Sequence, residues 1–148
     1  MSDIHDDAVS RAEADFGARI VAGEDIYSQD VDVFAPCALG AELNSRTIPQ
    51  LKAQIVAGAA NNQLERAEDG AELAARNILY APDYVINAGG VINLHYERES
   101  GYERDRAMAH TERIYEIALQ IFGRAKSEGR PTSDIADAMA EELLGAES

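Results

Sequence analysis

One stretch limits the possible folds more than any other: Tyr80–Leu94, which reads YAPDYVINAGGVINL. It is rich in apolar and β-branched side chains, and Asn87 stands just before the pair Gly89–Gly90. We predict a buried strand over Tyr84–Asn87, then a site-forming turn, then a helix. The segment Asp32–Asn44 shows the same order of strand, turn and small residues. Two such units predict an α/β fold with a ligand site at the strand ends.

Short strands and helices alternate along the rest of the chain. We predict strands at Ser2–Ile4, Ala18–Val21, Val31–Ala35 and Lys52–Ala57, a helical turn at Ala38–Leu43, and helices at His5–Phe16, Asp69–Arg76, Tyr102–Ser127 and Ser133–Leu144. This alternation favours a mostly parallel sheet with helices on both faces. Right-handed crossovers would place the turns after the strands at one edge of the sheet. That edge would gather Asp3, Cys37, Ala38, Asn61 and Asn87.

Composition excludes several classes of partner. The formal net charge is -14, from 27 acidic and 13 basic residues, and such a surface repels nucleic-acid phosphates. No apolar run approaches the roughly 18 residues that a membrane span needs. The start, MSDIHDDAV, lacks the apolar core of a secretory signal. The single cysteine excludes an intramolecular disulfide and fits a reducing compartment, so we predict a cytoplasmic protein.

Two kinds of polar residue at the predicted edge could bind a ligand. The Asn87 amide can donate and accept, so it can hold a carboxamide or a carboxylate. A plain turn explains Asn87 equally well, and Asn61 carries the same two interpretations. Asp3 stands where dinucleotide-binding sheets place the acid for a ribose diol. The sequence lacks the accompanying G-x-G fingerprint, so an ordinary surface acid is the simpler interpretation.

Cys37 and the histidines do not form a catalytic or metal pattern. A nucleophilic thiol needs a base within reach, and no spacing connects His5, His95 or His110 with Cys37. We therefore interpret Cys37 as a small, buried packing residue. Cysteine, histidine and acidic residues also lack a zinc-like spacing. Neither a catalytic residue nor a metal site is assigned.

Three segments resemble one known family. VFAPCALGAELN, IPQLKAQIVAGAANNQL and LYAPDYVINAGGVINL resemble the leucine dehydrogenase branch of the glutamate, leucine, phenylalanine and valine dehydrogenases. The resemblance extends through SDIHDDAVSRAEADFGARIV and the downstream helices. It implies a truncated Rossmann-like fold, with a partial dinucleotide-binding domain at 1–99 and C-terminal helices at 100–148. It also implies NAD-dependent oxidative deamination of a branched-chain L-amino acid to its 2-oxo acid.

The resemblance implies roles for particular residues. On the cofactor side, it implies that Asp3 holds the ribose and that the turn Cys37, Ala38 and Leu39 lines the adenosine and bridging part of NAD. It implies that Asn61 lies near the nicotinamide ribose and that Asn87 holds the nicotinamide or substrate end. On the substrate side, it implies that Val91 and Leu94 line the pocket for the aliphatic side chain. Val91 and Leu94 are one helical turn apart and can contact the same apolar group.

The sequence also departs from the family. The family's catalytic domain, with its two lysines and an aspartate, should precede this segment, yet the chain has only Lys52 and Lys126. We therefore expect the isolated chain to be inactive, because proton transfer and carboxylate binding need such groups. A complementing catalytic domain or a homo-oligomer is the expected partner. The alternatives are a non-catalytic nucleotide-binding or interaction module and a degenerate, truncated gene product.

Overall fold

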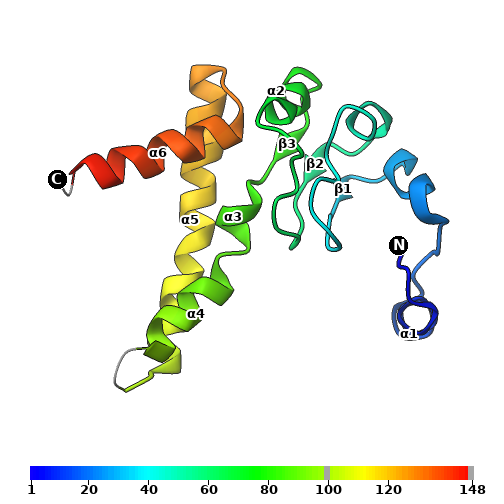
Figure 1. The fold of residues 1–148 in the computed structure, drawn as a ribbon, viewed down its shortest axis with the longest axis horizontal. Coiled ribbons are helices and arrows are strands. Elements are labelled where there is room, and N and C mark those ends of the chain that lie inside the picture. The colour runs from blue at the N-terminus through cyan, green and yellow to red at the C-terminus, as the bar shows by residue number, and fades with distance from the viewer. Residues whose placement is uncertain (99–100, 147–148) are drawn as a thin grey trace.

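Three short parallel strands form a sheet at the centre of the molecule (Figure 1). In this computed structural model, which describes residues 1–98 and 101–146, the strands are β1 (Val33–Phe34), β2 (Ile55–Val56) and β3 (Leu79–Tyr80). Their order is β1-β2-β3, and Ile55 pairs with Val33 on one side and with Leu79 on the other. The predicted α/β class with a parallel sheet is confirmed. The predicted domain boundary falls at residues 99 and 100, which lie outside the described residues.

Helices and 3₁₀ turns occupy the connections and the C-terminal part. They are α1 (Asp6–Phe16), η1 (Gly23–Ser28), η2 (Ile48–Gln50), α2 (Glu68–Ala75), α3 (Asp83–Ile86), α4 (Gly89–Arg98), α5 (Arg104–Glu128) and α6 (Thr132–Ala146). The long helix α5 contacts α3, α4 and α6, and α2 contacts both β3 and α6. In Figure 1 these C-terminal helices lie on one side of the sheet and α1 on the other. Among the described residues, no helix is both long and apolar enough to cross a bilayer.

The predicted strand at Tyr84–Asn87 is wrong. This segment forms most of the short helix α3 and the residue after it, and the strand lies upstream at Leu79–Tyr80. Pro82 takes the position before the first turn with φ -55°, where its fixed φ suits a helix start. The β-branched Val85 then packs against a cluster of helical residues, so tertiary packing overrides its local strand preference.

Three further local predictions are wrong. Ser2–Ile4 and Ala18–Val21 are not strands. Met1, which lies just before the first segment, accepts the Val21 N–H through its carbonyl at 3.0 Å and donates from its ammonium group to the Arg19 carbonyl at 2.5 Å. Two bonds at one residue do not make a ladder. The helical turn predicted at Ala38–Leu43 is also absent. Here the Ala41 and Leu43 N–H groups donate to Asn62 and Gln63 carbonyls instead.

Two side-chain hydrogen bonds anchor the first turns of α6. The helix begins at Thr132, one residue before the predicted start at Ser133. The Thr132 hydroxyl donates to the Tyr80 carbonyl at 2.6 Å, which ties α6 to the end of β3. The Tyr84 hydroxyl donates to Asp137 Oδ1 at 2.6 Å. Burial and the hydrogen bond with Asp137 both raise the pKa of Tyr84, so this donor stays protonated.

Two separate clusters of buried apolar residues form the core. The sheet cluster contains Phe34, Leu43, Ile48, Leu51, Ala53, Val56, Leu73, Ile78 and Tyr80, with Ile26, Tyr27 and Leu64 against it. The helix cluster contains Ile121, Ala125, Ile135 and Ala136, with Val85, Phe122 and Met139 against it. The sheet cluster fixes the strands and their loops. The helix cluster joins α5 to α6 and to the segment that follows β3.

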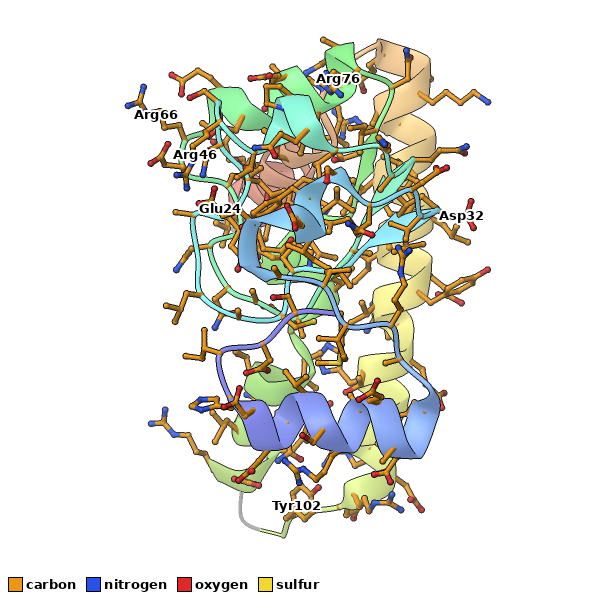
Figure 2. The ribbon with its side chains drawn as sticks, turned by 90° about the vertical axis from the view of Figure 1, so that its right-hand side faces the viewer. Glu24, Asp32, Arg46, Arg66, Arg76 and Tyr102 are labelled. Atoms are coloured by element: carbon orange, nitrogen blue, oxygen red, sulfur yellow. The ribbon has the colours of Figure 1, made fainter. Side chains whose placement is uncertain are left out.

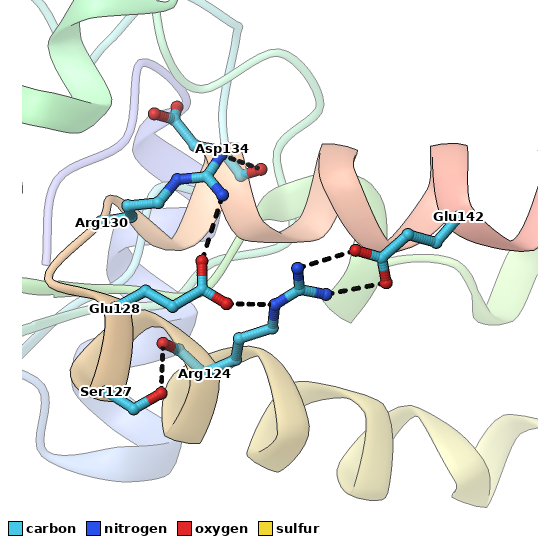
Figure 3. A network of polar contacts seen from close by, with 6 residues as sticks. All are labelled: Arg124, Ser127, Glu128, Arg130, Asp134 and Glu142. Carbon is cyan, nitrogen blue, oxygen red and sulfur yellow. Dashed lines mark hydrogen bonds and ion pairs between the residues drawn. The ribbon is translucent and has the colours of Figure 1, made fainter.

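On the surface, Arg124 of α5 bridges to α6 (Figure 3). Its guanidinium donates to both carboxylate oxygens of Glu142, at 2.8 and 2.7 Å, and to Glu128 at 2.5 Å. Another exposed ion pair joins Arg46 to Glu24 at 3.4 Å near η1 (Figure 2). Both are exposed to solvent, which screens their contribution. The bidentate geometry makes the Arg124 pair the more ordered of the two.

We expect Arg124→Gln to lower the melting temperature modestly at neutral pH, and this difference to shrink in acid. The hydrogen bonds from Arg124 lower the pKa of both Glu128 and Glu142 in the folded chain. Their stabilisation is therefore complete above the ordinary glutamate pKa and is lost as the pH falls through the lowered folded value. Thermal melts of both proteins across the acid range measure this. The exposed Arg113→Gln of the same helix is the control, and a difference that persists in strong acid would contradict the expectation.

Candidate functional site

The loops that follow the three strands meet at one edge of the sheet. Because the strands are parallel, their carboxyl ends lie together. The first two loops are in tight contact: a Cβ added to Gly58 would lie 2.1 Å from the Pro36 carbonyl oxygen. Pro36 is buried there, whereas Cys37 is exposed. The prediction that Cys37 is a buried packing residue is wrong, because Pro36 takes the inward position.

Two predicted site residues from different loops are in direct contact. Asn87 Nδ2 donates to Asn61 Oδ1 at 2.6 Å. Within the described part of the chain, no other hydrogen bond uses these side chains, which leaves the Asn61 amide nitrogen and the Asn87 amide oxygen for a ligand. A paired donor and acceptor at a surface edge can bind a planar amide or a hydroxyl group.

The loop after β1 presents the other predicted cofactor residues. Cys37, Ala38 and Leu39 are all exposed, and 82% of Leu39 is accessible to solvent. Gly40 follows and packs onto the second loop, where an added Cβ would lie 2.8 Å from the Asn62 carbonyl oxygen. The exposed turn is therefore held beside Asn61.

The two predicted pocket residues share one face of α4. Val91 is 72% exposed and Leu94 59% exposed. They line a shallow hollow together with His95 and Arg98. An exposed apolar pair beside a cation could receive an aliphatic group that carries a carboxylate. The helix begins two residues after Asn87.

Asp3 is less closely connected to this edge. Its Oδ1 accepts the His5 N–H at 2.9 Å, just before α1. None of the α1 residues is buried, and the helix lies apart from the three strands in both views (Figures 1 and 2). Within the described residues, no hydrogen bond joins Asp3 to the strand-end loops. Its role at the edge stays a prediction.

Sequence reasoning missed the buried group beneath the edge. Asp83 is 6% exposed, and its carboxylate accepts the Tyr80 O–H and the Asn62 N–H, each at 2.6 Å. Burial and the bond with Asp83 raise the pKa of Tyr80, so its hydroxyl remains a donor. An acid directly after a proline, at the end of an apolar strand, was the available signal.

Neither lysine lies at this edge. Lys52 precedes β2, so it belongs to the opposite end of the strands, and Lys126 lies in the last turn of α5. Both are exposed. Nor do three or more His, Cys, Asp or Glu side chains of the described residues come together in a way that could hold a metal ion. The edge can bind through amides and apolar contacts, but it lacks a cation for acid–base chemistry.

Known proteins are similar to this chain in sequence and in fold. The family model for glutamate/leucine/phenylalanine/valine dehydrogenase matches residues 3–132. Leucine dehydrogenase of Geobacillus stearothermophilus is 50% identical over 144 residues, which are 97% of this chain and 39% of that protein. L-tryptophan dehydrogenase of Nostoc punctiforme is 49% identical over 145 residues, 97% of this chain and 41% of that protein.

The fold is also found in a crystal structure of L-tryptophan dehydrogenase from Nostoc punctiforme. That structure superposes with a TM-score of 0.93 at 48% identity and covers 98% of this chain and 44% of its own. The chain thus spans about two fifths of the length of the curated relatives it matches.

Proposed function

The chain belongs to the glutamate, leucine, phenylalanine and valine dehydrogenase family, and from this premise we propose that its strand-end edge binds NAD as part of an L-amino-acid dehydrogenase. The contact between Asn61 and Asn87 carries the proposal, because it brings together two polar residues that lie on different loops. The parent reaction is oxidative deamination of a leucine-type or valine-type amino acid to its 2-oxo acid.

The donor set fits the nicotinamide end of NAD. A carboxamide carries both donors and an acceptor, as does the amide of Asn87, so Asn87 would hold the nicotinamide and Asn61 its ribose. The exposed turn Cys37–Leu39 would line the adenosine side, and Asp3 would hold the ribose diol. NAD, when bound, takes up the hydride that leaves the amino acid.

The substrate side of the site is proposed to lie on α4. Val91 and Leu94 would contact the aliphatic side chain, and their exposed surfaces are large enough to make that contact favourable. A wall of this kind distinguishes aliphatic from polar amino acids, because a polar side chain would lose its hydration there. Relatives named leucine and valine dehydrogenase support an aliphatic substrate, whereas the relative named L-tryptophan dehydrogenase has an aromatic one.

The proton transfers are proposed to use residues outside this sequence. Deamination needs positioned groups that accept and donate protons, and both lysines lie away from the strand-end edge. We expect the purified chain not to form NADH from L-leucine. A complementing catalytic domain would supply these groups. A non-catalytic nucleotide-binding module is the second candidate, favoured by the absence of a lysine at the edge.

We expect NAD⁺ to shift the NMR signals of Asn61, Asn87 and the Cys37–Leu39 turn. Asn87→Ala should weaken the binding by about fivefold to thirtyfold, because one or two hydrogen bonds worth about 1 kcal/mol each are lost. A titration of the ¹⁵N-labelled chain with NAD⁺ measures both. The melting temperature should stay unchanged, since the Asn87–Asn61 bond is exposed.

Gln120→Ala, which removes an exposed amide from α5, serves as the matched control and should bind NAD⁺ like the wild type. Shifts confined to another face of the molecule, or none at millimolar NAD⁺, would contradict the proposed cofactor site. NADH formation by the purified chain would instead contradict the proposed use of outside catalytic residues.

A further inference from the structure

Asp83 connects three loops that the proposed site draws on. It lies at the start of α3, four residues before Asn87 along the chain. Its Oδ2 accepts the backbone N–H of Asn62 at 2.6 Å, so the segment after β3 is bonded to the loop after β2. The Asn62 carbonyl in turn accepts the N–H of Ala41 at 2.7 Å, which adds the loop after β1.

The bond from Asp83 adds to the stability of a left-handed backbone conformation at Asn62. Asn62 has φ +52°, in the left-handed region, and Ala41 has φ +61°. Such conformations cost free energy in residues with a side chain and persist where surrounding contacts impose them. The part-buried, charge-assisted bond to the Asn62 N–H is such a contact. The adjacent Asn61 takes its position from this turn.

The other carboxylate oxygen of Asp83, Oδ1, binds Tyr80 instead of the loop. Oδ1 accepts the Tyr80 hydroxyl at 2.6 Å, and the Asp83 N–H lies 3.3 Å from the same hydroxyl. Tyr80 is 2% exposed and belongs to the sheet cluster. This bond ties Asp83 to the sheet cluster, whereas the Oδ2 bond acts on the loop that carries Asn61 and Asn62. Mutation can therefore remove one of these two hydrogen bonds and leave the other.

We infer that Asp83 is a positioning residue: by fixing the left-handed turn at Asn62, it sets Asn61 against Asn87 and keeps this amide pair in the geometry that binds the nicotinamide end of the cofactor. The inference rests on the proposed function for its consequence in binding. Its structural part, the placement of the amide pair by Asp83, stands independently of NAD. Asp83 itself is buried and does not touch the ligand.

The test compares three variants of the whole chain by ¹⁵N NMR. In Asp83→Ala, the Asn62 amide proton should exchange with solvent roughly tenfold faster or more, because a bond to a charged acceptor is lost. The Asn87 side-chain amide signals should move toward those of a free amide, and NAD⁺ binding should weaken about tenfold. In Asp83→Asn, the remaining side-chain oxygen can still accept the Asn62 N–H, so most of both signatures should return.

Tyr80→Phe is the matched control. It removes the buried Tyr80–Asp83 bond and costs stability, but it leaves the Asp83–Asn62 bond in place. We expect a lower melting temperature with unchanged Asn87 amide signals and unchanged NAD⁺ affinity. If Asp83→Ala fails to fold, Asp83→Asn decides, because its neutral oxygen accepts the Asn62 N–H more weakly than a carboxylate does. Asn62 exchange and the Asn87 signals should then move part of the way toward the unbonded state in Asp83→Asn and stay unchanged in Tyr80→Phe, and no change in Asp83→Asn would overturn the inference.

Two results would overturn the inference. One is an unchanged Asn87 amide signature in folded Asp83→Ala. The other is an equal loss of that signature in Tyr80→Phe, which would mean that general destabilisation causes it. If the wild-type chain does not bind NAD⁺, the proposed function fails, while the exchange rate at Asn62 and the Asn87 signals still decide the role of Asp83.

Discussion

Gly58→Ala is expected to destabilise the chain by about 3 kcal/mol or more, which corresponds to a melting temperature lower by roughly 10 °C. The added Cβ would lie 2.1 Å from the Pro36 carbonyl oxygen and 2.4 Å from the Pro36 nitrogen. Both are backbone atoms of a buried residue, so no side-chain rotation relieves the overlap. The same carbonyl accepts the Ala60 N–H at 3.0 Å, and this bond would be displaced as well.

The effect should reach the proposed site. Gln63 donates to the carbonyls of Gly58 and Ala60, at 2.7 and 3.0 Å, so a shift of Gly58 loosens the whole loop that carries Asn61. We therefore expect NMR signals of residues 58–63 to broaden or move before the protein unfolds. Urea unfolding measured by circular dichroism gives the free energy, and NMR locates the change.

Gly123→Ala is the matched control for Gly58→Ala. Gly123 lies in the C-terminal part of α5, before its last turn, and an added Cβ meets nothing within 4 Å. It should stabilise the helix by roughly 0.5–1 kcal/mol, since glycine lowers helix propensity by about this amount. Wild-type stability in Gly58→Ala would show that the first two loops do not pack as closely as the structure has them.

The long helices could be predicted closely from the sequence, whereas the strands could not. The apolar stripe and Gly129 predict a helix at Tyr102–Ser127, and α5 spans Arg104–Glu128. A helix bonds within itself, so its pattern is local. A strand of two residues carries no periodic pattern, and its ends depend on partners far along the chain. The strand therefore lies at Leu79–Tyr80, upstream of the β-branched run that suggested it.

The meeting of Asn61 and Asn87 could be predicted from the sequence, but the residue that supports them could not. Parallel strands bring their following loops together, and on this ground Asn61 and Asn87 were expected at one edge, where they are in contact. Locally, the support beneath them is marked only by an acid directly after Pro82, which does not reveal its partner. The bond between Asp83 and Asn62 joins residues 21 positions apart, and only the folded chain shows that a buried carboxylate lies there.

Ile135→Ala is expected to cost about 2–5 kcal/mol, because it removes most of a fully buried side chain from a small cluster. Ile135 is 0% exposed and packs with Ile121, Ala125 and Ala136 where α6 crosses α5. The sheet cluster contains none of these residues. Amide exchange should therefore accelerate most in α5 and α6, and less in the core strands, because separate packing units can open separately.

Leu143→Ala in the same helix provides the control. Leu143 is 70% exposed, so its loss should change stability by no more than about 0.5 kcal/mol. In Ile135→Ala, the Thr132–Tyr80 bond still ties the start of α6 to β3, and NAD⁺ binding should weaken less than in Asp83→Ala. Equal acceleration of exchange in β2 and α6 would contradict the division into two clusters. The helices would then be part of the same cooperative unit as the sheet, and the proposed site would depend on both.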